Sequence, residues 1–221
     1  MTGDSLTLYV DARLHSPYAL SVFVTLQEKG LDFSLRTVNL SAREQALPAY
    51  KQLSLTAKVP TLVHGRFALS ESSAITEYLE EHFPSPTYAP VYPRDARERA
   101  RVRQVQAWLR SDLIPLRTER PTSVIFEEPA IASLSAAANE AAQKLFFVAD
   151  TLLSNGTGHV VSQWSIADVE LTMMLNRLLL NGDAVSEALA TYARRQWQRP
   201  SIQSWVSLRK GPLLNRDLGA R

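Results

Sequence analysis

The 221-residue chain contains no cysteine, only 4 histidines and no long uninterrupted run of apolar residues. Without cysteine it can form no disulfide and cannot use a thiol of its own in catalysis. Zinc sites in proteins are built mainly from cysteine and histidine, so we expect no metal site. A membrane-spanning helix needs roughly 20 apolar residues, so we expect no membrane partner. The first residues lack the pattern of a secretory signal, which leads us to expect a cytoplasmic protein.

The chain also has little excess charge of either sign, with a formal net charge of +2 at pH 7. Arginines concentrate between positions 94 and 103, but Asp95 and Glu98 interrupt them and no aromatic residue alternates with them. Surfaces that bind nucleic acids combine basic groups with aromatic stacking platforms. The arginines therefore indicate a solvated helix start with local ion pairs, and we expect no nucleic-acid partner.

The first 84 residues alternate β-rich runs with helical patterns. The spacing of apolar residues and the turn residues between them predict strands at 6–10, 33–40, 59–63 and 67–69, and helices at 18–29, 42–52 and 72–82. Four prolines follow at positions 84, 86, 90 and 93. Since proline interrupts both helices and central strands, residues 85–93 are predicted to be a linker. Residues 1–84 therefore form an α/β domain of the order βαβαββα.

Residues 94–221 show few strand signals and read as an all-α domain. Val102, Val105 and Leu109 recur at helical spacing, and an interruption is expected near Pro115. Further helices are predicted at 132–153, 166–180, 185–197 and 201–208. The helix at 166–180 is apolar on nearly every face, so we expect it at the centre of this domain.

The segment Ser16-Pro17-Tyr18-Ala19 lies where the first strand passes into the first helix. Free amide groups and the helix dipole favour an anion at such a turn. A serine hydroxyl there can donate a hydrogen bond to a bound thiolate and so favour the ionised form of a ligand's thiol. Taken alone, Ser16 is also typical of a helix N-cap.

Two further segments could hold the rest of a peptide-like ligand. Val59-Pro60, at the start of a hairpin strand, matches the place where thioredoxin-like domains keep a cis proline, beside which a ligand backbone can pair like one more strand. An edge-strand proline without a ligand is the alternative. Glu71-Ser72 lies at the start of the helix predicted at 72–82. The N-terminus of this helix suits a ligand carboxylate, and Glu71 suits a ligand ammonium group. A simple helix cap is the alternative.

These elements, in the order SPYAL, KVPTLVHG and LSESSAITEYLEEHF, resemble the glutathione-binding domain of cytosolic glutathione transferases, most closely bacterial members with a serine active site. The likeness extends from about residue 6 to 208. Ser165-Ile166-Ala167-Asp168 is similar to the N-capping box of the central helix in that family's second domain. The resemblance implies a thioredoxin-like domain followed by an all-α domain, which is the glutathione-transferase architecture.

The resemblance also implies that glutathione is a co-substrate. Its contacts would be Ser16 with the thiolate, Val59 and Pro60 with the cysteinyl backbone, Glu71 and Ser72 with the γ-glutamyl group, and Lys58 with the glycyl carboxylate. Other classes of the family place a catalytic tyrosine near Tyr9, but they lack the Ser-Pro-Tyr turn, so we prefer Ser16. Asp168 is expected to be a structural residue of the capping box with Ser165.

A second, small hydrophobic or peroxide substrate would then lie between the domains. The pocket is expected to include Leu14, His15, Trp108, Ser111 and Asp112. His15 is interpreted as a polar contact or base, or as a wall of the pocket. Trp108 and Trp205 lie at apolar positions of predicted helices, which is typical of core residues.

The sequence leaves two functions open. The first is an enzyme that ionises glutathione and transfers its sulfur to an electrophile, with reduction of peroxides or disulfides as a further activity. The second is a non-catalytic interaction module of the same fold in a stress-response or translation complex. Family members are usually homodimers, and a homodimer is expected here.

Overall fold

The computed structural model describes residues 5–210, which group into two compact units. Unit 1 comprises the residues up to Pro90 together with those from Pro200 onward, and unit 2 runs from Val91 to Arg199. Unit 1 is therefore assembled from segments at both ends of the chain.

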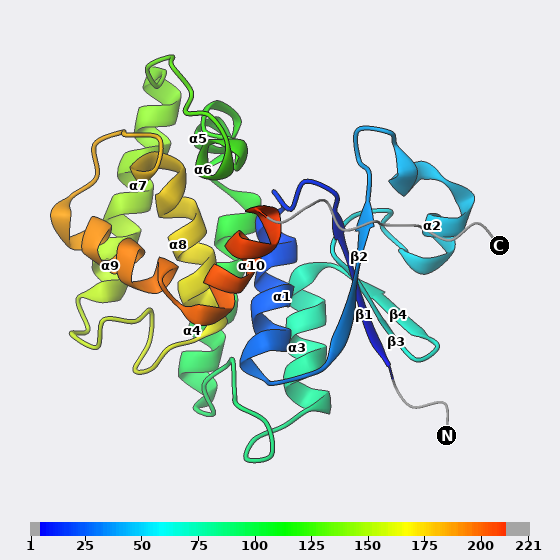
Figure 1. The fold of residues 1–221 in the computed structure, drawn as a ribbon. Helices are drawn as coiled ribbons and strands as arrows, with labels where there is room; N and C mark the ends of the chain where they lie inside the picture. Colours follow the sequence, from blue (N-terminus) through cyan, green and yellow to red (C-terminus); the bar gives the residue numbers. More distant parts are fainter. Residues whose placement is uncertain (1–4, 211–221) are drawn as a thin grey trace. The chain divides into compact units, whose positions relative to one another are not determined.

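Unit 1 is built on a four-stranded sheet in the order β2-β1-β3-β4 (Figure 1). The strands are β1 (Leu6–Asp11), β2 (Phe33–Val38), β3 (Thr61–His64) and β4 (Phe67–Ser70). β1 pairs with β2 in parallel, whereas β3 pairs antiparallel with both β1 and β4. A parallel pair needs a crossover connection, which α1 (Pro17–Glu28) supplies.

The helices of unit 1 cover both faces of this sheet. α1 and α3 (Ser72–His82) lie on one side of it and α2 (Pro48–Leu53) on the other (Figure 1). Leu8 and Val10 of β1 are completely buried, as are Leu20 of α1 and Leu79 of α3. The predicted fold class, an α/β domain of thioredoxin-like order followed by a helical region, is confirmed.

The helix predicted over residues 42–52 is wrong in its first half. Residues Glu44–Ala46 form a single 3₁₀ turn, η1, and the α-helix begins only at Pro48. Leu47 is extended, with φ −65° and ψ 144°. Proline disfavours helical geometry in the residue before it but fits the first turn of a helix, so Pro48 starts α2 and cannot lie inside a longer helix.

The last helix, α10 (Pro200–Lys210), belongs by its contacts to unit 1, whereas the sequence grouped it with the helical domain. Trp205 is completely buried, as expected of a core residue, and its ring meets the edge of Phe23 at a centroid distance of 5.2 Å. The Ser201 hydroxyl donates a hydrogen bond to the Glu28 carboxylate at the end of α1, at a distance of 2.5 Å. α10 thus lies along α1 and completes its burial.

Unit 2 is helical throughout its described elements. These are α4 (Ala96–Ser111), α5 (Ile114–Glu119), α6 (Ser123–Phe126), α7 (Ala136–Leu153), α8 (Ile166–Leu179) and α9 (Glu187–Trp197). The expected interruption follows Ser111, and Pro115 lies in the first turn of α5. Every residue of α8 from Ile166 to Leu178 is buried, so the prediction of a central helix is confirmed. The short α6 was not predicted.

Asp168 is the hub of a buried network at the start of α8. The capping box expected with Ser165 is present, because Asp168 Oδ2 accepts a hydrogen bond from the Ser165 N–H at 2.9 Å. Asp168 Oδ1 accepts from the Val160 N–H and from the Tyr192 hydroxyl, both at 2.9 Å. Asp168 is fully buried, so these donors replace its hydration.

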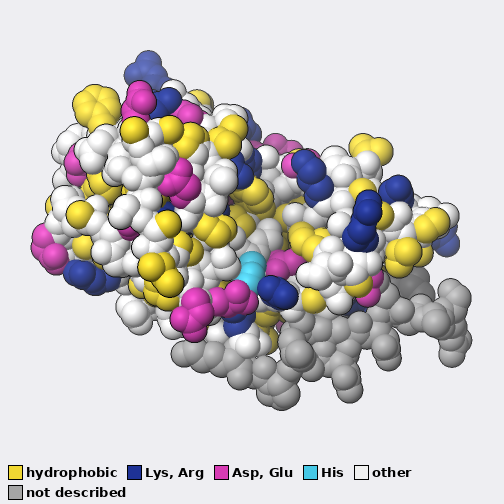
Figure 2. Space-filling model, turned by 90° about the horizontal axis from the view of Figure 1, so that it is seen from above, with side chains coloured by type: hydrophobic (Ala, Val, Ile, Leu, Met, Phe, Trp, Pro, Cys, Tyr) yellow, Lys and Arg dark blue, Asp and Glu magenta, His cyan; other side chains and the backbone are white. Residues whose placement is uncertain are grey.

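The surface carries scattered apolar side chains between charged ones of both signs, on the face seen in Figure 2. Phe147 and Leu55 are among the large hydrophobic residues that are exposed, and they belong to different units. Within residues 5–210, no helix has the length and apolar composition that crossing a membrane requires.

Candidate functional site

The register of the sheet brings the three predicted binding segments to one end of unit 1. β1 and β3 are antiparallel neighbours with Tyr9 opposite Thr61, so β1 ends where β3 begins. β4 is antiparallel to β3 with Ser70 opposite Thr61, so β4 ends there as well. The segments at this end carry Ser16 after β1, Val59-Pro60 before β3 and Glu71-Ser72 after β4.

Two helices also begin at this end of the sheet. α1 starts at Pro17 directly after the turn that follows β1, and α3 starts at Ser72 directly after β4. The first N–H groups of a helix have no partner within the helix, and the helix dipole adds a partial positive charge there. The site is therefore suited to a ligand that carries negative charge at two separate positions.

Ser16 is the N-cap of α1, as its sequence position suggested. Its backbone is extended, with φ −65° and ψ 115°, and its Oγ accepts a hydrogen bond from the Ala19 N–H at 3.2 Å. A hydroxyl that accepts through its oxygen still has a hydrogen to donate. The capping role and a donor role toward a ligand are therefore compatible in one side chain.

Asp11, at the end of β1, holds the turn that carries Ser16. Its Oδ2 accepts from the His15 N–H at 2.7 Å and its Oδ1 from the Ser16 N–H at 2.9 Å. Asp11 is 5% exposed, so its carboxylate is satisfied mainly by protein donors. We did not single out this residue from the sequence, although an aspartate five positions before the serine could have indicated a side chain that closes a turn.

The turn also contains a strained residue. Leu14 has φ 55°, in the left-handed region, and its side chain is 1% exposed. Its N–H donates to the Asp11 carbonyl at 2.9 Å, and its own carbonyl accepts from the Trp205 indole N–H at 3.1 Å. Such a conformation persists only where several contacts enforce it.

The loop before β3 is held by hydroxyl groups. The Lys58 carbonyl accepts from the hydroxyls of Tyr50 at 2.9 Å, Thr61 at 3.0 Å and Ser54 at 3.1 Å. Burial raises the pKa of Tyr50, so this phenol stays protonated as a donor at neutral pH. The Val59-Pro60 peptide is cis, as predicted. The Lys58 side chain is exposed.

Each of the three segments at this end contains one residue, other than glycine, with positive φ. Leu14 has φ 55°, Ala57 has φ 52° and Glu71 has φ 73°. Glu71 is exposed and lies at the N-cap position of α3, while the following Ser72 is 4% exposed. Strained backbone tends to gather where a fold positions groups for a ligand.

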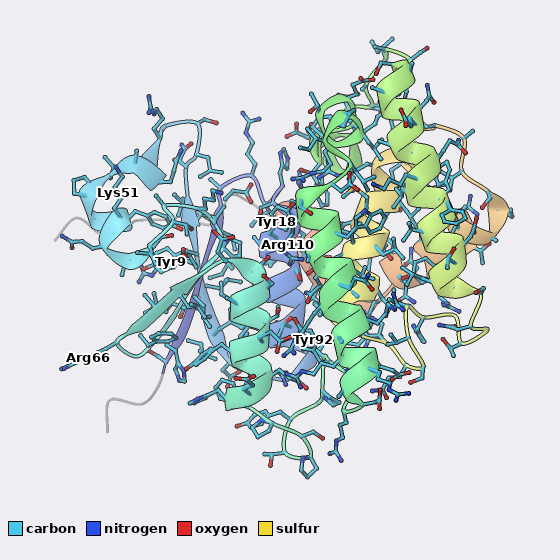
Figure 3. All side chains as sticks on the ribbon, turned by 180° about the vertical axis from the view of Figure 1, so that it is seen from behind. Tyr9, Tyr18, Lys51, Arg66, Tyr92 and Arg110 are labelled. Carbon is cyan, nitrogen blue, oxygen red and sulfur yellow. The ribbon has the colours of Figure 1, made fainter. Side chains whose placement is uncertain are left out.

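Tyr9, the competing hydroxyl, lies on β1 toward α2 (Figure 3). Its ring contacts that of Tyr50 edge-on at a centroid distance of 6.0 Å. Ser16 lies after the strand, at the helix N-terminus, whereas Tyr9 lies within the sheet.

The residues expected to line a second-substrate pocket are divided between the units. Leu14 and His15 lie in unit 1, and Trp108, Ser111 and Asp112 lie at the end of α4 in unit 2. Within unit 2, Asp112 Oδ2 accepts from the Trp108 indole N–H at 2.9 Å and from Lys144 at 2.5 Å.

These contacts decide what Asp112 can do chemically. The hydrogen bond from Lys144, and next the one from the Leu113 N–H, lower the pKa of Asp112 below its usual value. The carboxylate is therefore ionised at neutral pH, so it fixes the Trp108 ring and cannot act as a general acid. Trp108 is half-buried, so it is less enclosed than a core residue.

Matches to known proteins cover both halves of the chain. A family model described as the glutathione S-transferase N-terminal domain matches residues 15–82, and one described as the glutathione S-transferase C-terminal domain matches residues 95–210. The C-terminal family model includes α10, whereas the contacts of α10 assign it to unit 1.

Individual relatives carry the same name. Glutathione S-transferase theta-3 of Mus musculus is 37% identical over 103 residues, 47% of this chain and 41% of the relative. The chain therefore spans well under half the length of that relative. Glutathione S-transferase Z1 of Arabidopsis thaliana is 32% identical over 155 residues, 70% of this chain and 68% of the relative.

Solved structures agree with these matches. A glutathione transferase homologue from Burkholderia GL BGR1, crystallised with bound glutathione, is 45% identical with a TM-score of 0.76, covering 93% of this chain and 98% of that one. A diazinon-metabolizing glutathione S-transferase of Bombyx mori shares the fold at 21% identity, with a TM-score of 0.77 over 92% of this chain and 97% of that one. The chain belongs to the glutathione S-transferase family.

Proposed function

We propose that this chain is a glutathione transferase in which the Ser16 hydroxyl holds the glutathione sulfur as a thiolate. The observation that carries the proposal is the meeting of three segments and two helix N-termini at one end of the sheet, with the Ser16 hydroxyl at the first of these N-termini. The 45% identical Burkholderia homologue was crystallised with glutathione, which supports the same ligand here.

Energetics make the role of Ser16 reasonable. An unperturbed thiol has a pKa of about 8.5, and lowering it by two units requires about 2.7 kcal/mol of preferential stabilisation of the thiolate. A hydrogen bond to a charged group contributes about 1.5–3 kcal/mol, and a helix N-terminus about 0.3–1 kcal/mol. The combined range of the two contributions includes this value, and the chain needs no thiol of its own.

The remainder of glutathione is assigned to the neighbouring segments. Val59, beside Pro60, pairs with the cysteinyl backbone, because the residue before such a proline offers its backbone as an added strand would. Glu71 binds the γ-glutamyl ammonium group, while Ser72 and the start of α3 bind its carboxylate. The exposed Lys58 side chain binds the glycyl carboxylate.

The thiolate sulfur then attacks a small electrophile, such as the ring carbon of an aryl halide, and forms a C–S bond as the halide leaves. With a peroxide it attacks one oxygen as the O–O bond breaks, and a second glutathione converts the resulting sulfenic acid to glutathione disulfide and water. Leu14 and His15 from unit 1, with Trp108, Ser111 and Asp112 from unit 2, are proposed to line the pocket for this second substrate. The protein is proposed to act in the cytoplasm as a homodimer. Light scattering at micromolar concentration is expected to give twice the mass of 24.7 kDa, and a monomer mass would contradict the dimer.

Ultraviolet absorbance of bound glutathione thiolate, followed against pH, tests the proposal. In the native protein the pKa of the bound thiol should lie well below 8.5, and in Ser16→Ala it should return toward about 8.5. The second-order rate constant kcat/KM for conjugation to an aryl halide should fall about 10- to 100-fold, the range of one charge-assisted hydrogen bond.

Two variants serve as controls for Ser16→Ala. Ser186 caps α9 by accepting from the Leu189 N–H at 3.4 Å, so Ser186→Ala removes a comparable cap elsewhere and should leave the thiol pKa unchanged. Ser16→Thr keeps a hydroxyl and should retain most of the thiolate signal. If the native protein does not bind glutathione, the enzyme hypothesis is wrong and the interaction module is favoured. If the pKa of the bound thiol is unchanged in Ser16→Ala, the role proposed for Ser16 is wrong.

A further inference from the structure

The position of the Ser16 hydroxyl depends on a turn whose conformation is costly. Leu14, two residues before Ser16, has φ 55° and is almost completely buried. A branched or bulky residue in the left-handed region carries a free-energy penalty, so the turn would relax if its contacts were removed. Asp11 holds the amide groups on one side of this turn, those of His15 and Ser16.

The other side of the turn is held by α10. The Trp205 indole N–H donates to the Leu14 carbonyl at 3.1 Å, across 191 residues of sequence. Trp205 is completely buried, and its ring is fixed against Phe23. Arg209, one turn further along α10, reaches the same carbonyl at 3.4 Å. An indole N–H only donates, so its buried position here requires an acceptor, and the Leu14 carbonyl is that acceptor.

We propose that Trp205 is a positioning residue for Ser16, acting through the Leu14 carbonyl. The inference rests on the proposed function of Ser16. Trp205 binds the Leu14 carbonyl, and Asp11 binds the N–H groups of His15 and Ser16. Together these hydrogen bonds fix the orientation of the peptide planes on both sides of His15. The Ser16 hydroxyl is thereby held at the distance from the sulfur that a short hydrogen bond needs.

This arrangement predicts which steps depend on Trp205. When the Trp205 N–H is removed, the Leu14 carbonyl keeps the longer, 3.4 Å bond from Arg209, so the turn is held less firmly and Ser16 occupies a wider range of positions. The thiolate then loses part of its stabilisation. The one hydrogen-bond donor of the Trp205 side chain is used by the Leu14 carbonyl, and not by the segments at Val59 and Glu71 that are proposed to hold the peptide part of glutathione. The thiol pKa and kcat should therefore change, and KM for glutathione should rise by no more than the factor by which the thiolate form is lost.

The test is Trp205→Phe, which keeps an aromatic ring near Phe23 and removes the N–H donor. At pH 7 we expect the thiolate fraction of bound glutathione and the kcat for conjugation to fall roughly three- to tenfold, the range of one hydrogen bond. KM for glutathione should rise by no more than that same factor, because only binding of the ionised form is weakened. If Trp205→Phe does not fold, a benzothienylalanine at position 205 replaces it, because its sulfur occupies the place of the indole N–H.

Ser201→Ala is the matched control on the same helix. It removes the hydrogen bond from α10 to Glu28 at the far end of α1 and leaves the Leu14 carbonyl untouched. It should lower the melting temperature without changing the thiol pKa. A native protein that forms no thiolate would overturn the proposed function itself. A native protein with the thiolate, together with a folded Trp205 variant of unchanged thiol pKa and kcat, would overturn only the role of Trp205.

Discussion

Replacing Asp168 with alanine is expected to lower the free energy of unfolding by about 3–5 kcal/mol, because several buried donors lose one charged acceptor. The Val160 and Ser165 amides and the Tyr192 hydroxyl all donate to this carboxylate at 2.9 Å. The residue is fully buried, so water does not replace the lost bonds without opening the start of α8. The expected loss is larger than the roughly 1 kcal/mol of an ordinary helix cap.

Urea denaturation followed by circular dichroism measures this effect. Tyr192→Phe removes one of the donors and should cost about 1 kcal/mol. Burial, and then the neighbouring Asp168 carboxylate, raise the pKa of Tyr192 well above its usual value, so its hydroxyl remains a donor at neutral pH. The folded fraction of Asp168→Ala should keep its specific activity for conjugation. Normal stability combined with lost activity would mean that Asp168 acts in catalysis.

Replacing Lys29 with alanine is the second change with a large expected effect, a loss of about 3–5 kcal/mol. The Lys29 side chain is completely buried at the end of α1, and its ammonium group lies 2.6 Å from Glu80, which is 8% exposed. The same group donates to the carbonyls of Phe83 at 3.0 Å and Ala89 at 3.2 Å. Alanine would leave the Glu80 carboxylate buried without its cation.

A double-mutant cycle separates the cost of an unpaired charge from the value of the pair. Replacing both residues, as Lys29→Met with Glu80→Leu, should destabilise the protein less than Lys29→Met alone, because no charge is then buried. Thermal unfolding at pH 7 provides the comparison. Additive losses in the double variant would contradict a coupled ion pair. Thiolate formation should be unaffected, since Lys29 lies at the opposite end of α1 from Ser16.

Local patterns in the sequence predicted most of the fold. The spacing of apolar residues located β1, α1 and the buried α8, because each depends on neighbours in sequence. The Ser165 capping box was expected from the resemblance to the family, and its two partners lie within one turn of each other. The helix start at Pro48 was missed, although a proline inside a helical pattern indicates that a helix begins there.

Tertiary contacts explain what was not predicted. The ammonium group of Lys29 binds a carbonyl 60 residues away, and nothing in the local sequence distinguishes it from a solvated lysine at a helix end. Trp205 was expected in the core, but its acceptor, the Leu14 carbonyl, has no local signature. For the candidate site, residue types and their order led us to propose Ser16 and Glu71, and their contacts with glutathione stay a prediction. The contacts of Asp11 with the His15 and Ser16 amides came from the geometry of the turn.

The hydrogen bond from Trp205 to Leu14 also concerns the order in which the protein is made. The ribosome releases the chain from its amino end, so β1 and the turn with Ser16 emerge long before α10. Contacts between distant segments form late in folding, because a long loop must close first. The nascent chain therefore carries Ser16 on a turn that lacks the Trp205 hydrogen bond until α10 has emerged from the ribosome. The Ser16 hydroxyl reaches its final position only when α10 packs against α1.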